Sequence, residues 1–135
     1  MRTIIAFVMV ATSCFPQGPA AVTNEEARKA GEAWLSLVDG QKYEESWKTA
    51  GTQFRSQVTQ DQWVAALQRG RDPFGPAVSR TVSRLDMAKT LRGAPDGDYA
   101  IYHFMTEFRN KSGVTERLTL VMEDGRWQVA AYAIH

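Results

Sequence analysis

Apolar residues recur at every third or fourth position through the first half of the chain, a spacing typical of amphipathic helices. The first such stripe consists of Ala27, Ala30, Trp34, Leu37 and Val38. It follows the segment Thr23–Glu26, in which a threonine and a glutamate have the spacing of a capping box. Gly40 can adopt the left-handed conformation that often ends a helix. The pattern predicts a helix that begins after Thr23 and ends at Asp39.

Two further helices are predicted before the chain changes character. The first covers residues 41–50. The second follows residues 59–62, whose sequence Thr-Gln-Asp-Gln is another capping box, with Val58 and Trp63 in the positions of a hydrophobic staple. Residues 71–76 contain two prolines, which cannot continue a helix. The first half of the chain is therefore expected to contain three helices.

The second half alternates apolar and polar residues with the period of two that is typical of strands. In the segment 77–91 the phase of this alternation changes, which predicts a β-bulge near Ser83–Arg84. Asp124-Gly125 is a strong signal for a two-residue hairpin turn, and residues 93–97 and 110–113 provide the other connections. Four strands are expected, over residues 77–91, 99–108, 114–123 and 126–134.

The hairpin turn also predicts which side chains share a face of the sheet. The expected partners are Met122 with Trp127, Leu120 with Val129, Leu118 with Ala131, and Phe108 with Val114. This register places Tyr102, Phe104, Val114, Glu116, Leu118, Leu120 and Ala133 on one apolar face. The opposite face would carry Ile101, His103, Met105, Val121, Tyr132 and Ile134. The predicted fold class is α+β, with three N-terminal helices packed on one face of a curved four-stranded antiparallel sheet.

The first twenty residues have the composition of an export signal. A basic start is followed by the uncharged, mostly apolar segment 3–15, which is too short to span a bilayer. Small residues favour cleavage after Ala20, with Ala21 as a near alternative. The segment 11–14, Ala-Thr-Ser-Cys, also resembles a bacterial lipobox, in which Cys14 would be lipidated. The first interpretation predicts a periplasmic or secreted protein, and the second an outer-membrane-anchored lipoprotein.

Length, charge and cysteine content limit what the exported chain can be. The 135 residues less a 20-residue leader leave 115, which suits a single domain over residues 21–135. The chain has 16 basic and 15 acidic residues, so its net charge of +1 excludes a strongly basic nucleic-acid-binding protein. The single cysteine lies in the leader, so no disulfide framework is expected. No metal site, cofactor or transmembrane segment is predicted.

Several segments of the mature chain together form a recognisable pattern. They are residues 34–39, Tyr43 with Ser46-Trp47, Val58-Thr59 with Gln62-Trp63, residues 93–97 with Tyr99, residues 118–120, residues 123–127 and Val129-Ala130. With these segments the chain resembles the DUF4019 family of small exported bacterial proteins over residues 25–135. The family is a domain of unknown function, so the resemblance implies an exported bacterial protein and no catalytic residues. The order of helices and strands also resembles the NTF2-like or cystatin-like architecture, an analogy that says little about function.

Glu116 is the polar residue whose predicted position is most informative. It falls on the helix-covered face near Thr106 and Ala133, where a carboxylate must be hydrogen-bonded, ion-paired or at the mouth of a cavity. In NTF2-like folds a cavity lies between helices and sheet, so Glu116 and Thr106 could line a ligand pocket walled by Tyr43 and Trp34. The alternatives are a carboxylate paired with a nearby arginine, and aromatic residues that belong to the core.

The opposite face of the predicted sheet offers a different surface. Its apolar residues Ile101, Met105, Val121, Tyr132 and Ile134 would form a patch suited to homodimerisation or to docking of an envelope protein. His103 lies on the same face, as a half-exposed strand residue or as a general base. The arginines Arg69, Arg71, Arg80, Arg84 and Arg92 form a solvated surface or an anion-binding patch.

These observations lead to one first hypothesis and two alternatives. The first is a non-catalytic exported domain that binds a small molecule or an envelope protein. The second is a small enzyme that uses Glu116 as its acid or base in a cavity between helices and sheet. The third is an accessory or assembly module that acts through the outer sheet face. No residue is assigned as catalytic under the first hypothesis, and no nucleic-acid partner is expected.

Overall fold

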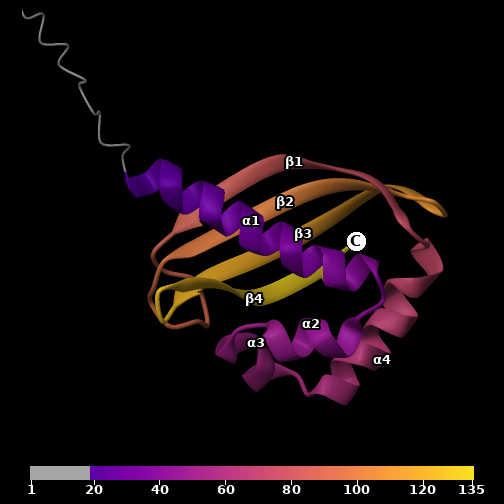
Figure 1. Cartoon of the computed structure of the whole chain (residues 1–135), viewed down its shortest axis with the longest axis horizontal. Helices are drawn as coiled ribbons and strands as arrows, with labels where there is room; N and C mark the ends of the chain where they lie inside the picture. Colours follow the sequence, from indigo (N-terminus) through magenta and orange to yellow (C-terminus); the bar gives the residue numbers. More distant parts are fainter. Residues whose placement is uncertain (1–18) are drawn as a thin grey trace, which may run out of the picture.

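The order of elements along the chain confirms the α+β class (Figure 1). The computed structural model describes residues 19–135, with their side chains from residue 24 onward. Residues 1–18 of the predicted leader, with Cys14, lie outside the described residues. The elements are α1 (Pro19–Asp39), α2 (Tyr43–Thr49), α3 (Thr52–Gln57), α4 (Gln60–Gly70), the 3₁₀ turn η1 (Asp72–Phe74), β1 (Ala77–Ala88), β2 (Tyr99–Phe108), β3 (Lys111–Glu123) and β4 (Arg126–Ile134). The four strands form one antiparallel sheet in the order β1-β2-β3-β4.

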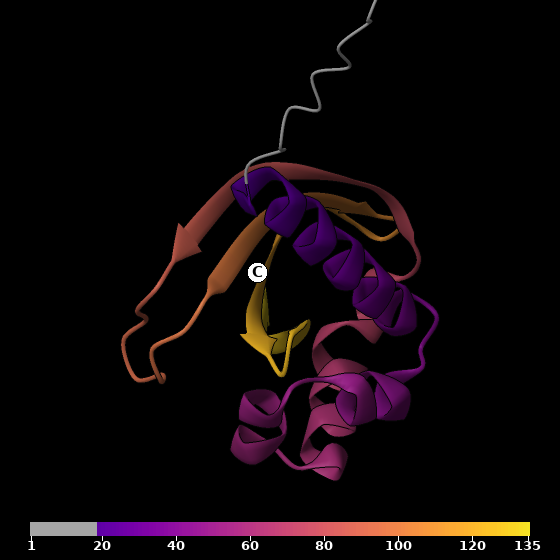
Figure 2. The ribbon, with the colours of Figure 1, turned by 60° about the vertical axis from the view of Figure 1, so that its left-hand side comes forward.

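The helices that precede the sheet differ from the prediction in number and placement. Four α-helices stand where three were expected, because α3 forms directly after α2. Gly51 separates the two and lies against β4, where its amide donates to the Val129 carbonyl at 2.8 Å. Its lack of a side chain is required, since a Cβ there would lie 2.9 Å from the Cβ of Gln128. Only α1 crosses the face of the sheet, while α2 and α4 pack against each other and α3 packs against β4 (Figures 1 and 2).

One of the two predicted capping boxes is present. The Thr59 hydroxyl accepts from the Gln62 amide at 3.2 Å, and the Gln62 side chain accepts from the Thr59 amide at 3.0 Å. The box predicted at Thr23–Glu26 is wrong, because α1 begins four residues earlier, at Pro19. Proline is favoured in the first turn of a helix, where its missing N–H would have no partner in any case. No helix in the described part of the chain is both long and apolar enough to cross a membrane.

The pairing of β1, β2 and β3 keeps the predicted faces but not every predicted partner. The bulge expected near Ser83 is confirmed by a register shift between Val82 and Arg84. Val114 pairs with Thr106 instead of Phe108, so this register differs from the prediction by two residues. A shift of two residues leaves each side chain on its expected face, because the strand repeat is two. Accordingly Glu116 lies on the helix-covered face and is completely buried.

A second bulge, in β4, overturns part of the predicted outer face. The register shifts after the Leu120–Val129 pair, so that Ala130 is an extra residue and Leu118 pairs with Tyr132 instead of Ala131. An extra residue reverses the alternation beyond it. Tyr132 and Ile134 therefore lie on the helix-covered face, opposite to the prediction. Alternation alone does not reveal the bulge, because Ala130 and Ala131 are small and fit either face.

The core has a large and a small part. The large part lies between the four helices and the sheet and is rich in aromatic rings. The ring centres of Trp34 and Tyr132 are 5.4 Å apart, and those of Phe54 and Trp63 are 4.8 Å apart. The small part lies on the opposite face, where Tyr99, Val121 and Ala130 are buried beneath the β1–β2 loop. Val121 is thus not part of an exposed patch, and the predicted outer-face patch is wrong in three of its five residues, Val121, Tyr132 and Ile134.

Candidate functional site

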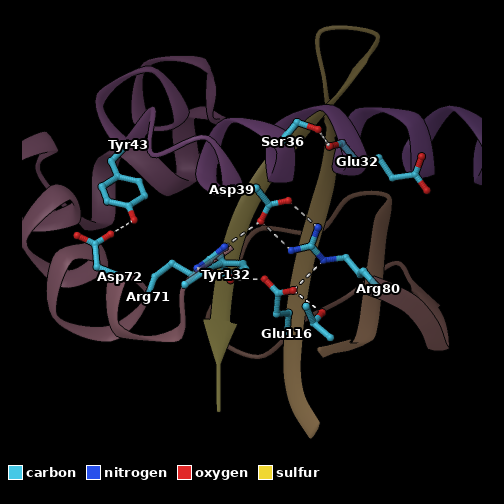
Figure 3. A network of polar contacts seen from close by, with 11 residues as sticks. Glu32, Ser36, Asp39, Tyr43, Arg71, Asp72, Arg80, Glu116 and Tyr132 are labelled. Atoms are coloured by element: carbon cyan, nitrogen blue, oxygen red, sulfur yellow. Dashed lines mark hydrogen bonds and ion pairs between the residues drawn. The ribbon is translucent and has the colours of Figure 1, made fainter. Parts of the chain in front are cut away.

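Glu116 stands at the centre of a buried polar cluster that Figure 3 shows from close by. Its Oε1 accepts from Arg80 Nε at 2.8 Å and from the Thr106 hydroxyl at 2.5 Å. Its Oε2 accepts from the Tyr132 hydroxyl. The donors come from β1, β2 and β4, while Glu116 itself belongs to β3. One carboxylate therefore links all four strands.

Asp39 extends this cluster to the helical layer. It lies at the end of α1, and both of its carboxylate oxygens accept from Arg80, at 2.9 and 3.0 Å. Arg71, which follows α4, donates to Asp39 at 3.3 Å and to the Gly75 carbonyl at 2.5 Å. Its guanidinium carbon lies 4.2 Å from the centre of the Phe108 ring. Two carboxylates thus face two guanidinium groups, so the charges within the cluster are balanced.

The surroundings change the proton affinities of two members of the cluster. Burial disfavours the charged form of Arg80, but its hydrogen bonds to Asp39 and Glu116 outweigh this effect and raise its pKa. Burial also raises the pKa of Tyr132, and the negative charge of Glu116 raises it further. Both residues therefore hold their protons throughout the neutral range, and Tyr132 remains a hydrogen-bond donor.

This geometry suits a structural ion pair better than an acid or base. Both oxygens of Glu116 are engaged, and the carboxylate is shielded by the residues that bind it. A surface groove of about 550 Å³ between α1 and β1 reaches Arg80, with Glu32, Ser36 and Phe104 also in its walls. Arg80 is already bound to two carboxylates on its inner side. The alternative of a carboxylate paired with an arginine describes Glu116 correctly.

The other predicted site residues, Thr106, Trp34 and Tyr43, differ in whether they contact Glu116. Thr106 bonds to it directly. Trp34 packs against Tyr132, and its indole N–H donates to the Ser46 carbonyl at 2.8 Å, so it belongs to the core. The Tyr43 hydroxyl donates to Asp72, away from Glu116 (Figure 3). The structure brings Glu116 and Thr106 together and does not place Tyr43 with them.

Two of the direct partners of Glu116, Arg80 and Tyr132, were not predicted from the sequence to lie beside it. Tyr132 was placed on the wrong face by the unrecognised bulge at Ala130. Arg80 was grouped with neighbouring arginines as a solvated or anion-binding patch, although it pairs with Thr106 on the inner face. An arginine and a glutamate at inward positions of one sheet could have indicated their ion pair, since buried charges are rarely unpartnered.

A second candidate site is a groove on the opposite face of the sheet, which we call the outer groove. It encloses about 510 Å³, a volume within the range of small-molecule sites. Its walls are α3 and the β1–β2 loop, which lie toward the same end of the molecule (Figures 1 and 2). Its lining residues are Gln53, Gln57, Arg84, Asp86, Leu91, Arg92, Gly93, Ala94, Tyr99, Ile101, His103, Arg117, Thr119, Ala130 and Ala131.

The floor and walls of the outer groove are held by specific contacts. Gln53 of α3 donates to the Tyr99 hydroxyl at 3.2 Å, which fixes one wall to the sheet. The loop is closed by the Gly97 amide, which donates to the Lys89 carbonyl at 2.9 Å. The bulge in β4 contributes two small residues, Ala130 and Ala131, which leave space above the floor. The groove is therefore preformed in the folded chain.

The charges of the outer groove are predominantly positive. Arg84, Arg92 and Arg117 line it, against the single carboxylate of Asp86. Asp86 is already paired with Arg84 at 2.9 Å and lies 3.5 Å from His103 Nε2. Among residues 19–135, Arg92 and Arg117 form no ion pair. Two guanidinium groups are therefore available beside a floor that includes Ile101 and Ala131.

No grouping of three His, Cys, Asp or Glu side chains suited to a metal ion occurs within the part of the chain that the structure describes. The cations of both candidate sites are arginines, which do not ligate metals and bind carboxylate and phosphate groups in a fixed fork geometry.

Fold and sites together define a small α+β protein, in which residues 19–135 form four α-helices and one antiparallel sheet, with a closed polar cluster on one face and a basic groove on the other. The chain belongs to the DUF4019 family, proteins of unknown function, whose model matches residues 30–132. Its fold is similar to that of a protein from Catenulispora acidiphila in a 2.5 Å structure. The two are 16% identical, with a TM-score of 0.59 over 86% of this chain and 92% of that chain. No curated protein matches the chain.

Proposed function

We propose that this protein is an exported, non-catalytic binding domain whose outer groove holds a small organic anion. The observation that carries the proposal is the pair Arg92 and Arg117, two guanidinium groups without an ion-pair partner in residues 19–135, beside a partly apolar floor. Guanidinium groups bind carboxylates and phosphates through paired, charge-assisted hydrogen bonds. Ile101, Leu91 and Ala131 would contact an apolar part of the same ligand.

The contrast between the two faces supports binding in the outer groove over catalysis in the interior. Between the helices and the sheet, aromatic rings occupy the core and Glu116 is bound by Arg80, Thr106 and Tyr132. A general acid or base must instead reach the reacting group of a substrate within hydrogen-bond distance. The outer groove has open space and unpaired positive charge, so it is the better candidate for a ligand.

Binding to the outer groove is testable with matched carboxylates and amides. Decanoate should raise the melting temperature of the protein in a saturable way, because it presents an anionic head and an apolar chain, whereas decanamide should not. The double variant Arg92→Gln/Arg117→Gln should weaken decanoate binding by about tenfold or more, measured by isothermal titration calorimetry.

The control variant is Arg69→Gln, which removes an exposed arginine from α4, outside the groove. It should bind decanoate as the wild-type protein does. Equal binding of the carboxylate and the amide, or equal affinity of the double variant and the wild type, would contradict an anion site in the outer groove.

Export is the second part of the proposal and rests on the segment 1–20. The mass of the mature protein, purified from a bacterial envelope fraction, should correspond to a chain that begins at Ala21. A mass that corresponds to a chain beginning at an acylated Cys14 would show lipidation instead of cleavage after Ala20. The protein would still be exported. An intact N-terminus in the cytoplasm would contradict export.

A further inference from the structure

The exposed large apolar side chains of the described residues gather along one edge of the sheet. Val78, Val82 and Met87 lie on β1, with exposures of 70%, 40% and 47%. Met105, the fourth, lies on β2 opposite Thr81 of β1, and so on the other face of the sheet from Val82 and Met87. Soluble proteins place exposed apolar residues of this size singly more often than in rows, and a row of them marks an interaction surface.

This edge also offers backbone groups for pairing. β1 has 12 residues and pairs only with β2 in the described sheet. The edge at β4 is different, because α1 and α3 pack against that strand and Gly51 donates to its Val129 carbonyl. A long unpaired edge strand is a template for another strand, so β1 is the edge at which the sheet can be extended.

Register shifts divide β1 into two regular segments, Ser79–Val82 and Arg84–Ala88, of which the second is the longer. In this segment Arg84 and Asp86 point to the same face, with Arg84 Nε 2.9 Å from Asp86 Oδ2. Two copies of this strand can pair antiparallel about a two-fold axis perpendicular to the sheet. Such an axis places one residue opposite its own copy and keeps the two outer faces on the same side.

The charges select one register from those that the segment allows. An axis at Leu85 places each Arg84 directly opposite Asp86 of the second copy, which forms two cross-strand ion pairs. An axis at Asp86 would place two carboxylates opposite each other, and an axis at Met87 would leave Asp86 opposite Ala88. The register at Leu85 is therefore the one in which the segment is complementary to itself.

We propose that two copies of this protein pair along β1, with Arg84 of each copy opposite Asp86 of the other and the sheet continued across the edge. The pairing buries Met87, which lies within the paired segment and is 47% exposed in a single copy. The two ion pairs form on the outer face, beside the outer groove that Arg84 and Asp86 line, and the pairing does not require a ligand in that groove.

A charge exchange tests this register directly. Sedimentation velocity should show an increasing fraction of wild-type dimer as the concentration rises toward about 1 mM, the range of weak specific contacts. Arg84→Asp and Asp86→Arg should each raise the dissociation constant by about tenfold or more, because each places like charges opposite one another. The double variant Arg84→Asp/Asp86→Arg should restore the dimer, because both pairs are re-formed with exchanged signs.

Arg69→Asp, a charge reversal on α4 away from β1, should leave the dissociation constant unchanged, and thermal unfolding should show that every variant is folded. A monomer at all concentrations would overturn the proposal, and leave β1 as an edge for some other strand. A dimer that both single variants retain, or that the double variant fails to restore, would overturn the register at Leu85.

Discussion

At the scale of single residues, the buried cluster around Glu116 explains how a charged group is tolerated inside the core. An isolated carboxylate in this position would be strongly destabilising, and hydrogen bonds from charged and neutral donors offset that cost. Arg80 provides the opposite charge, while Thr106 and Tyr132 satisfy the remaining acceptor positions. Removing one donor leaves the carboxylate buried with fewer partners, so each member of the cluster is expected to matter for stability.

Replacing Tyr132 by phenylalanine isolates one of these bonds. At neutral pH the variant Tyr132→Phe should lower the free energy of unfolding by about 1–3 kcal/mol, because Glu116 Oε2 loses its donor while the ring packing remains. Urea denaturation followed by tryptophan fluorescence would measure the change. A loss below about 0.5 kcal/mol would show that the Tyr132–Glu116 bond contributes little.

The wild-type protein and the variant Tyr132→Phe should also differ in how their free energies of unfolding change at alkaline pH. The pKa of Tyr132 is raised in the folded protein, so above about pH 10 the unfolded chain loses this proton while the folded chain keeps it. The folded state then binds more protons, and its stability falls as the pH rises, by about 1.4 kcal/mol per pH unit for one group. Stability measured from pH 9 to about 11 should fall more steeply for the wild type than for Tyr132→Phe, and parallel curves would contradict this assignment.

At the scale of elements, two of the bulges in the sheet, at Ser83 and at Ala130, separate what the sequence could predict from what it could not. The bulge at Ser83 was predictable because large apolar residues on either side of it change phase. The bulge at Ala130 was not, because the alanines around it fit either face, and so Tyr132 was placed outside. The hairpin at Asp124-Gly125 and the cap at Thr59 were predictable, since both depend on residues next to one another in sequence.

Contacts between distant elements were harder to predict, because they do not depend on residues next to one another in sequence. The partners of Glu116 come from three other strands and its link to α1 runs through Arg80, so no local pattern contains the cluster. The outer groove depends on where α3 and the β1–β2 loop lie relative to the sheet. Sequence alone identified Glu116 and Thr106 as neighbours, because a register error of two residues leaves the face of a side chain unchanged.

At the scale of the whole molecule, the two faces of the sheet have different roles. The face beneath α1 holds the large core and the closed polar cluster, which together join helices and strands. The other face carries the small core and the outer groove, in which arginines exceed carboxylates. Folding therefore depends mainly on the first face, and the second is available for a ligand.

The most direct test of this account is to locate a bound anion by amide chemical shifts. Titration of the isotope-labelled protein with decanoate should give its largest shifts at His103, Arg117 and Ala131, which line the outer groove. Trp34 and Thr106, on the helix-covered face, should shift little. Largest shifts at Trp34 and Thr106 would instead place the ligand between helices and sheet, and would contradict the central claim that the outer groove is the binding site.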